Sequence, residues 1–505
     1  MKFSNKYFLI PVLAGTVLVS SCSKDYLKTE PTEKLSAEQL EAASKQDPTL
    51  LNGLVDGLYT TMYRPGAGGV SGSEEDFGQK GVDIYMDLIS GDMAVEGFNW
   101  GWYEAVYRFY ASLDYSRTEN YIPWRYYYRI IYGANTVLDA LGGSDVEQTS
   151  KIKRQIAGQA LAMRAYAYIY LSNVYTSGYG DGSAKTIPIY KDAKTPNHPK
   201  ATGKEVYDLI ISDLTKAIQY LSDYNRPSKE KIDANVAKGL LVYALAARGS
   251  NEDLTQVIAL SKELASKFPK TRPTELSAIF DINGNVTNPE SGFNNVATPS
   301  WIWGVDITPE SNLELASYWS MMDKFTYGYA SSGDAKLINS GLYDLIKADD
   351  VRKTQFDVDD ALAPTSKFYD PGREIDGQRP VTTDYLYMRA DEFYLMSAEA
   401  YARLNKDAEA RTDLKNFLKG RLPDASLAYI DLLAGQALKD EIFLQTRIEF
   451  WGEGKVILAM KRMKQSITRG DNHMYNAGET FSWNSPEMTF PIPQNEVLNN
   501  PYLNQ

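Results

Sequence analysis

The sequence predicts a mostly α-helical protein, in which pairs of amphipathic helices form one scaffold and long irregular inserts separate these pairs. Three observations lead to this fold class. Apolar residues recur with helical periodicity over several long segments. Small residues, above all alanine, lie on these apolar stripes, so neighbouring helices can approach closely. Segments rich in glycine, proline, asparagine and serine separate the helices, and such segments cannot continue a long helix.

The clearest helical stripes lie in residues 204–221 and 154–175. The first stripe consists of Val206, Leu209, Ile210, Leu214, Ala217, Ile218 and Leu221. The second contains Ala160, Met163, Ala167, Tyr170, Leu171 and Val174. Further helices are predicted near residues 49–63, 118–141, 233–248, 251–267, 386–404, 407–419 and 434–464. Antiparallel helix pairs of this kind are typical of tetratricopeptide-type units, although the repeat consensus is too degenerate to identify. The predicted scaffold spans residues of about 118–270 and 384–465.

The inserts cover residues of about 64–117, 270–383 and 467–490. Loops this long in a compact domain are usually functional or disordered. Disordered segments are poor in aromatic residues, whereas two of these inserts contain paired tryptophans. We therefore expect ordered, functional loops, and a single domain over residues 22–505.

The N-terminus has the layout of a secretory signal. Lys2 and Lys6 precede an apolar run over residues 8–19, which is too short to span a bilayer. Small residues then lead to Cys22, the only cysteine of the 505 residues. This pattern fits a bacterial lipobox, so residues 1–21 are predicted to be a lipoprotein signal peptide and Cys22 the lipidation site. A single cysteine also excludes an internal disulfide framework.

Composition excludes several classes of function. The formal net charge of −12 argues against a nucleic-acid partner, which needs a basic surface. The two histidines, His198 and His473, lie in turn-rich segments without a second ligand at metal-binding spacing. The sequence has no phosphate-binding loop, nucleophile elbow or dinucleotide fingerprint. Neither a cofactor nor a metal is therefore expected.

Aromatic residues make up 12% of the chain, and those in the inserts suggest sugar binding. An aromatic ring can cover the C–H face of a pyranose, while polar side chains at its edge pair the hydroxyls. In "WGW" and "WIW" the tryptophans are two positions apart, so an extended chain would direct both to one side. The predicted ligand-binding residues are Asn99, Trp100, Trp102, Tyr103, Trp301, Trp303, Asp306, Tyr318 and Trp319, with Asp323 close behind.

Several separated segments resemble the SusD/RagB lipoproteins of Bacteroidetes. They are "CSKDYLKTEP" after the lipobox, "GANTVLDAL" followed by "AGQALAMRAYAYIYLSNVYTSGYGD", "YLYMRADEFYLMSAEAYARLN", "RIEFWGEGKVILAMKRM" and the closing "FPIPQNEVLNNPYLNQ". The third places Arg389, Glu392 and Glu399 as in the family. The segments occur in family order from residue 22 to 505. One departure is "LQTRIEF", where Arg447 is the only basic residue before the "EFWGEG" segment.

The resemblance implies a helical scaffold of four tetratricopeptide-like units with an irregular, loop-rich lobe. The inserts at about 64–117, 270–383 and 467–490 would form this binding lobe. It also implies a lipoprotein on the outside of the outer membrane, held by its N-terminal lipid. Lys24 and Asp25 resemble the signal that sends such lipoproteins outward. Family members act as lids on a SusC-type TonB-dependent transporter and capture oligosaccharides or, in some members, peptides. Exposed, coplanar tryptophan faces would indicate that the ligand is a sugar. A deep groove with mixed pockets between the lid and the transporter would indicate that the ligand is a peptide.

A second class of function, a secreted glycoside hydrolase, depends on Glu449 and Glu453. The two carboxylates lie four positions apart, on one helical face if the helix continues through Gly452, and paired carboxylates are what a glycosidase uses. The alternative, which the resemblance favours, is that both are structural ion pairs in the scaffold. Trp451 and Trp124 are likewise predicted to be packing residues. No enzymatic activity is expected.

Overall fold

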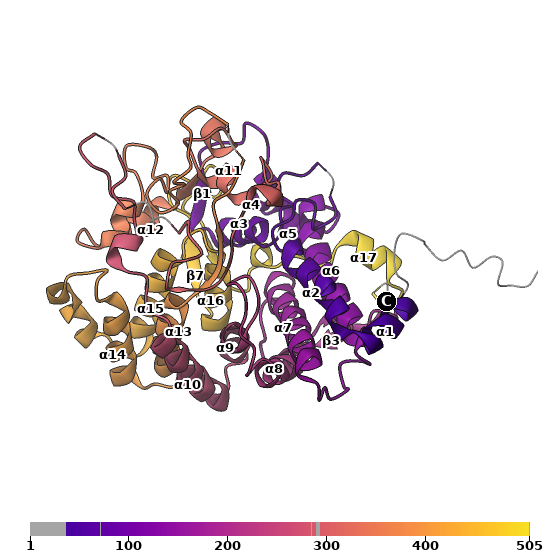
Figure 1. Ribbon diagram of the computed structural model, residues 1–505. Helices are drawn as coiled ribbons and strands as arrows, with labels where there is room; N and C mark the ends of the chain where they lie inside the picture. Colours follow the sequence, from indigo (N-terminus) through magenta and orange to yellow (C-terminus); the bar gives the residue numbers. More distant parts are fainter. Residues whose placement is uncertain (1–36, 71, 284, 289–292, 379, 504–505) are drawn as a thin grey trace, which may run out of the picture.

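A row of helices forms the scaffold. The computed structural model describes residues 37–70, 72–283, 285–288, 293–378 and 380–503. Each helix of the row packs on the next, and the row occupies the lower half of Figure 1. Its members are α6 (Thr118–Ala140), α7 (Lys151–Val174), α8 (Gly203–Tyr220), α9 (Ala234–Arg248), α10 (Asn251–Lys267), α13 (Asp391–Arg403) and α14 (Asp407–Leu418). The predicted helical fold class is confirmed.

Local sequence explains where these helices begin and how closely they pack. Thr202 and Glu205 form a reciprocal capping box at the start of α8, and Ser250 and Asp253 form another at α10. A Cβ atom at Gly158 of α7 would lie 2.8 Å from the Leu221 side chain. The absence of a side chain at this position therefore lets α7 approach the end of α8.

The other helices and strands lie outside this row. The helices are α1 (Ala37–Gln46), α2 (Asn52–Thr61), α3 (Gln79–Ser90), α4 (Glu104–Tyr107), α5 (Tyr110–Leu113), α11 (Tyr318–Met322), α12 (Ser340–Leu345), α15 (Gly435–Glu449), α16 (Val456–Met463) and α17 (Gln494–Asn499). The strands are β1 (Met93–Val95), β2 (Lys185–Pro188), β3 (Lys200–Thr202), β4 (Trp301–Val305), β5 (Lys336–Ile338), β6 (Tyr385–Arg389), β7 (Ser466–Thr468) and β8 (Thr480–Ser482). They form antiparallel two-stranded pairs: β1 with β5, β2 with β3, β4 with β6 and β7 with β8.

Three predicted segments differ from the structure. Residues 64–98 contain the helix α3, whose twelve residues are all buried, including Lys80, Asp83 and Asp87. The helix follows a stretch rich in glycine and serine, and its polar side chains are buried, so the segment reads as part of an insert although its sequence has an amphipathic pattern. Residues 386–389 belong to strand β6 and not to the helix that follows. The helix predicted over 434–464 is interrupted, because Gly452 and Gly454 adopt positive φ angles of 78° and 69°.

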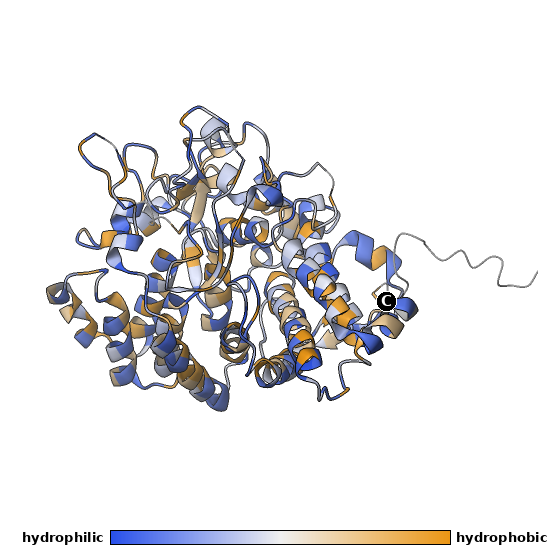
Figure 2. Ribbon diagram, in the orientation of Figure 1, coloured by the Kyte–Doolittle hydropathy of each residue, from blue (hydrophilic) through white to orange (hydrophobic). Residues whose placement is uncertain are grey.

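The hydrophobic core is continuous between the scaffold and the lobe. One cluster of buried residues extends from Leu51 to Phe490 and includes side chains of α7, α9, β4 and α11. Orange, apolar ribbon is concentrated on helix faces that point into the molecule, and the loops of the upper lobe are mostly blue or white (Figure 2). The lobe is therefore anchored on the scaffold by shared core packing.

A buried histidine ties the β7–β8 loop to the lobe. The ring of His473 stacks on that of Tyr107, with centroids 5.5 Å apart and an interplanar angle of 4°. Its Nδ1 lies 2.9 Å from the Tyr107 hydroxyl and its Nε2 lies 3.1 Å from the Gly91 carbonyl oxygen. Burial, with the charge of Arg469 adding to it, lowers the pKa of His473 to about 3. The folded protein therefore holds this side chain in its neutral form.

We expect the stabilising effect of His473 to disappear in acid. The unfolded chain takes up a proton near pH 6.5 and the folded chain does so only near pH 3, so stability falls as the pH drops between these values. At pH 7.5, His473→Gln should be less stable than the natural protein. At pH 4.5 the difference in unfolding free energy should shrink by about 2–3 kcal/mol. Urea unfolding at both pH values measures this, and an unchanged difference would contradict it.

Candidate functional site

Two tryptophans of the "FNWGWY" segment lie at the surface of the lobe, against a third ring from a distant loop. The Trp100 side chain is 57% exposed, and Trp102 is half-buried. Both pack edge-on against Tyr329, with centroids 6.0 and 6.1 Å from its ring and interplanar angles of 75°. We call Trp100, Trp102 and Tyr329 the aromatic ledge. Its most exposed member is Trp100, which presents its indole to solvent.

The ledge is held by pairing between its two loops. Strands β1 and β5 bring residues 97–102 beside residues 328–334. The Asp334 carboxylate accepts hydrogen bonds from the backbone N–H groups of Asn99 (2.6 Å) and Trp100 (3.1 Å). The Asn99 side-chain amide donates to the Ser332 carbonyl at 2.8 Å. Gly333 has φ +94°, and a Cβ atom there would lie 2.4 Å from the Asn99 amide nitrogen.

Buried groups under the ledge fix the chain where it turns back into the lobe. Tyr103 is fully buried and its backbone has a φ of 65°. Its N–H donates to the buried Glu75 carboxylate, which also accepts the Tyr85 hydroxyl at 2.6 Å. Burial raises the pKa of Glu75 to about 7. Lys336 lies 5.2 Å from the centre of the Tyr103 ring, and burial lowers its pKa to about 8.

Asp334→Ala should loosen the ledge without unfolding the scaffold. The substitution removes the acceptor of two backbone N–H groups in the Trp100 loop, each worth about 1 kcal/mol or more because the acceptor is charged. Backbone amides of residues 97–102 should then exchange hydrogen faster. Amides of α7 serve as the internal reference and should be unaffected. Mass spectrometry measures this exchange. Equal exchange rates of residues 97–102 in the natural protein and in Asp334→Ala would show that Asp334 does not support the Trp100 loop.

A cavity opens beside the ledge. It has a volume of about 470 Å³, within the range of small-ligand sites. Segments 309–327 and 370–381 provide its walls, which include Glu314, Trp319, Ser320, Asp323, Thr326, Tyr327, Asp370 and Gln378. The Tyr327 ring is 46% exposed at its rim. Ser320, which lines the cavity, accepts a hydrogen bond from the Tyr329 N–H at 3.3 Å, so cavity and ledge share one support.

The site is acidic. Burial and the negative charge of Glu314 raise the pKa of Glu74. Burial and the negative charge of Glu74 in turn raise the pKa of Tyr329 in the ledge. Glu74 therefore interacts electrostatically both with Glu314 of the cavity and with Tyr329 of the ledge.

The predicted binding residues divide into two groups. Asn99 and Trp100 are exposed and Trp102 is half-exposed, and these three lie together as the pattern predicts. Asp306 is exposed and lies beside Asp384. Burial, together with the negative charge of Asp306, raises the pKa of Asp384 to about 6. Tyr103 is buried below the ledge.

The second tryptophan group does not form a surface platform, so this prediction needs correction. Exposure is 0% for Trp301, 2% for Trp303, 3% for Tyr318 and 2% for Trp319. Strand β4 is buried on both faces, because it pairs with β6 and packs against the scaffold. The Trp303 indole donates to the Glu230 carbonyl at 2.8 Å, as a core tryptophan does. Only Trp319 reaches the cavity, as part of its wall.

Two tyrosines of the segment "FTYGYASSG" were not predicted to belong to the site. Tyr329 is a buried ring against which Trp100 and Trp102 pack, and Tyr327 is an exposed residue that lines the cavity. The segment carried a usable signal, since two tyrosines alternate with glycine in a stretch that ends in serines and glycine. This composition is typical of an ordered loop with aromatic side chains.

The carboxylates of the hydrolase hypothesis belong to a buried ion cluster. Arg389 contacts Glu449 (2.7 Å), Glu453 (2.9 Å) and Asp391 (2.9 Å). Burial opposes ionisation, yet the neighbouring arginines Arg421, Arg389 and Arg352 hold the pKa of Glu449 well below its usual value. The pKa of Glu453 is lowered as well, because Arg389 and Lys367 outweigh its burial.

This cluster is unsuited to glycoside hydrolysis and accounts for both glutamates structurally. A glycosidase needs one carboxyl with a raised pKa as its general acid, and both pKa values here are lowered. The helix ends at Glu449, so the two residues do not share a helical face. The structural ion-pair interpretation is confirmed. The basic partners come from other elements, which explains why "LQTRIEF" needs no further arginine. Trp451 and Trp124 are buried, as predicted.

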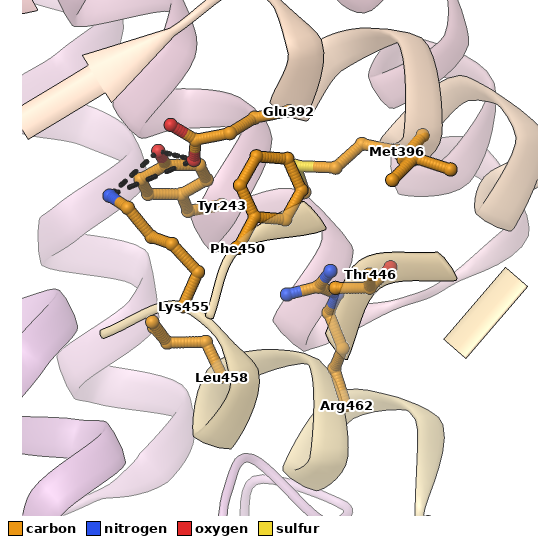
Figure 3. Close-up of a pocket in the computed structure, with 9 residues that line it drawn as sticks. Tyr243, Glu392, Met396, Thr446, Phe450, Lys455, Leu458 and Arg462 are labelled. Carbon is orange, nitrogen blue, oxygen red and sulfur yellow. Dashed lines mark hydrogen bonds and ion pairs between the residues drawn. The ribbon is translucent and has the colours of Figure 1, made fainter. Parts of the chain in front are cut away.

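A second charged pocket lies deep in the scaffold and is too small for a sugar. Figure 3 shows Lys455, Tyr243 and Glu392 pointing toward one another beside Phe450. The cavity measures about 20 Å³, room for about one water molecule. Burial opposes the charge of Lys455, but Glu392 and two tyrosines outweigh it and hold the lysine pKa well above its usual value. The pocket is thus part of the charged interior of the scaffold.

The described ranges between residues 37 and 503 contain neither a metal-binding cluster nor a membrane-spanning helix. No cluster of three or more His, Cys, Asp or Glu side chains is arranged to hold a metal ion there. Within the same ranges, every helix is too short or too polar to cross a bilayer. Cys22 and the predicted signal peptide lie outside the described residues.

Paired helices that carry a loop-built lobe define a tetratricopeptide-like class of protein, and solved structures share this fold. A SusD-like carbohydrate binding protein from Bacteroides vulgatus superposes with a TM-score of 0.70 at 23% identity, covering 90% of this chain and 96% of that one. A SusD superfamily protein from Bacteroides fragilis gives 0.69 at 24% identity, with coverage of 91% and 99%. A structure with a xylogluco-oligosaccharide gives 0.61 at 16%, with coverage of 89% and 98%.

Sequence comparison identifies the family. One family model, described as starch-binding and associating with the outer membrane, matches residues 25–248, and a second, described as the SusD family, matches residues 308–505. A SusD-like protein of Formosa agariphila is 21% identical over 304 residues, which span 59% of this chain and about half (52%) of that protein. This chain belongs to the SusD/RagB family.

Proposed function

We propose that this protein is a non-catalytic glycan-binding lipoprotein of the cell surface, which captures oligosaccharides and delivers them to a SusC-type TonB-dependent transporter. One observation carries the proposal: an exposed tryptophan and two further rings lie beside a cavity of about 470 Å³ lined by hydrogen-bonding side chains. Stacking on Trp100 would hold one sugar face. Carboxylate, amide and hydroxyl groups of the cavity would bind the hydroxyls of neighbouring units.

Direct binding tests this function. Purified residues 23–505 should bind at least one class of oligosaccharide on a glycan array, and calorimetry should give a saturable heat with that sugar. The same preparation should release no reducing ends from the sugars it binds. Peptide libraries serve as the alternative cargo. Binding of peptides and of no glycan would assign the chain to the peptide-capturing members of the family.

The transporter partner and the membrane anchor are proposed from family membership and from the N-terminal pattern. A lipid on Cys22 would tether the described domain through a segment of fourteen residues before α1 (residues 23–36). Extended chain spans at most about 3.5 Å per residue. The domain would therefore remain within about 50 Å of the membrane surface, close enough to cover a transporter.

Cys22→Ala should release the protein from the membrane. Stable anchoring requires two or more acyl chains, each buried CH₂ contributing about 0.8 kcal/mol, and the substitution removes the attachment point. Fractionation of cells that express each form should place the natural protein in the outer-membrane pellet and the variant in the soluble fraction. Retention of the variant in the pellet after a high-salt wash would exclude Cys22 as the anchor. Ser23→Ala is the matched control and should remain anchored.

A further inference from the structure

A second row of aromatic residues lies on the scaffold, away from the ledge. Helix α6 places Tyr121, Arg125, Tyr128 and Tyr132 on one face, because positions three and four apart lie on the same side of a helix. From Tyr121 to Tyr132 this face is roughly 16 Å long, at about 1.5 Å per residue. Figure 1 shows α6 and α17 to the right of β1 and α11, which precede the two loops of the ledge.

Two distant segments turn this helix face into a cavity. The loop of residues 190–196 and Glu496 of α17 enclose about 410 Å³ against it, a volume within the range of small-ligand sites. We call this cavity the α6 groove. Tyr190 meets Tyr128 edge-on, with centroids 5.6 Å apart and an interplanar angle of 87°. The Asn135 side-chain amide donates to the Tyr190 carbonyl at 3.0 Å, so the loop wall is fixed on α6.

The groove presents ring faces beside a donor and an acceptor. The Tyr132 side chain is 61% exposed, and Tyr121 is half-buried. Arg125 is exposed, and one of the five N–H groups of its guanidinium donates to the Tyr121 hydroxyl at 3.3 Å. Burial raises the pKa of Tyr190 to about 12 and the negative charge of Glu496 adds to this rise, so the Glu496 carboxylate lies close to that ring.

We infer that the α6 groove is a second carbohydrate site, which holds one stretch of a polysaccharide while another stretch lies at the ledge. The inference rests on the proposed function and adds a site to it. The rings would cover C–H faces of the sugar, and Arg125 and Glu496 would donate to its hydroxyls and accept from them. A protein partner usually covers about 800 Å² of a surface, whereas this groove is a confined cavity of ligand size.

The groove alone should bind a short sugar weakly. The Trp100 loop of the ledge is held in place by Asp334, whereas Tyr132 and Arg125 are exposed side chains that a ligand must immobilise at a cost in entropy. A polysaccharide bound at the ledge removes this disadvantage, because its next units stay near the groove at an effective concentration of order mM.

The size of the domain allows one chain to reach both sites. A domain of this length has a radius of gyration of about 23 Å. Two sites on its surface are therefore at most about 60 Å apart, a distance that a polysaccharide exceeds and a short oligosaccharide does not. Two linked sites raise the overall affinity by roughly 10²–10⁴-fold when one ligand engages both. The groove should therefore discriminate long chains from short ones.

Long and short forms of one sugar test the inference. The probes are xyloglucan, amylopectin and the polysaccharide of any oligosaccharide bound on the glycan array, each with a short oligosaccharide of its own repeating unit. Retardation in native gels that contain the polymer measures polymer affinity, and calorimetry measures the affinity for the short form. Tyr132→Ala should weaken polymer binding at least about tenfold, the low end of the gain from two sites. Affinity for the short form should stay unchanged.

Further variants separate the groove from general surface effects. Arg125→Met should weaken polymer binding in the same way as Tyr132→Ala. Tyr110→Ala removes a ring that is 42% exposed outside the groove and should change neither affinity. Thermal melts verify that each variant is folded.

The outcomes distinguish this inference from the proposed function. Unchanged polymer affinity in both Tyr132→Ala and Arg125→Met would overturn the inference and leave the proposed function intact. If the same two variants then co-purified less of the transporter, the groove would be a protein-docking site instead. Failure of the natural protein to bind any sugar, long or short, would overturn both the inference and the proposed function.

Discussion

Replacing Trp100 by alanine is expected to abolish measurable oligosaccharide binding while leaving the protein folded. The indole is 57% exposed and packs edge-on against Tyr329, so it contributes mostly ligand-contact area and little core. Aromatic anchors of this kind commonly cost 2 kcal/mol or more when truncated, which is about a thirtyfold loss in affinity. Calorimetry with a bound sugar and a thermal melt of the same preparation measure both quantities.

Two control variants make the result specific. Trp301→Ala removes a fully buried indole and should cost about 3–5 kcal/mol of stability. Tyr502→Ala removes a ring that is 54% exposed near the C-terminus, and it should change neither stability nor affinity. If Trp100→Ala instead lowers the melting temperature as Trp301→Ala does and binds sugar normally, the ledge is structural and the ligand binds elsewhere.

Replacing Arg389 by methionine is expected to destabilise the fold more than any surface substitution. The guanidinium is fully buried and contacts three carboxylates, those of Asp391, Glu449 and Glu453. Without it these carboxylates lose a shared partner in a water-excluded position. Breaking a buried ion pair from one side typically costs about 3–5 kcal/mol, and urea unfolding would measure the loss.

The matched control is an arginine in an exposed pair. Arg154 lies 3.4 Å from Asp223 with both side chains partly exposed, so Arg154→Met should cost less than about 1 kcal/mol. Glu453→Gln should also destabilise, because it leaves Arg389 and Lys367 short of one negative partner. A stable Glu453→Gln protein that had lost a hydrolytic activity would contradict the structural role and revive the hydrolase hypothesis.

Scaffold helices such as α8 and α10 could be predicted because they are half-buried. In α8 and α10 an apolar stripe faces the neighbouring helix and polar residues face water, and this contrast is visible in the sequence. The same reasoning failed for α3, where Lys80 and Asp83 pair with each other in the interior at 2.9 Å. Polar side chains that pair with each other in the core cannot be distinguished, from the sequence alone, from polar side chains of a solvated loop.

The site could be predicted in part, for a related reason. The "WGW" and "WIW" segments look alike, and what separates them is their neighbours: a surface turn around Gly101 in the first and a buried strand pair in the second. Whether a segment is buried depends on the segments that pack against it. Those segments can be distant in sequence, so a short stretch of sequence does not reveal them. Tyr329 was not predicted because its ring contacts Trp100 and Trp102 only once β1 and β5 have paired, and this pairing is not evident from the sequence.

The hydrogen bond that fixes the Trp100 loop also sets when the site can form. Asn99 and Asp334 are separated by 235 positions, so the ledge exists only after both halves of the chain have met. Contacts of such long sequence separation are slow to form, because the entropy of closing the loop must be overcome first. Under the proposed function, a chain that emerges from an export channel would therefore be unable to hold sugar at the ledge until the segment around Asp334 had paired with the segment around Asn99. Ligand binding at the ledge would then report that these two distant segments of the chain have come together.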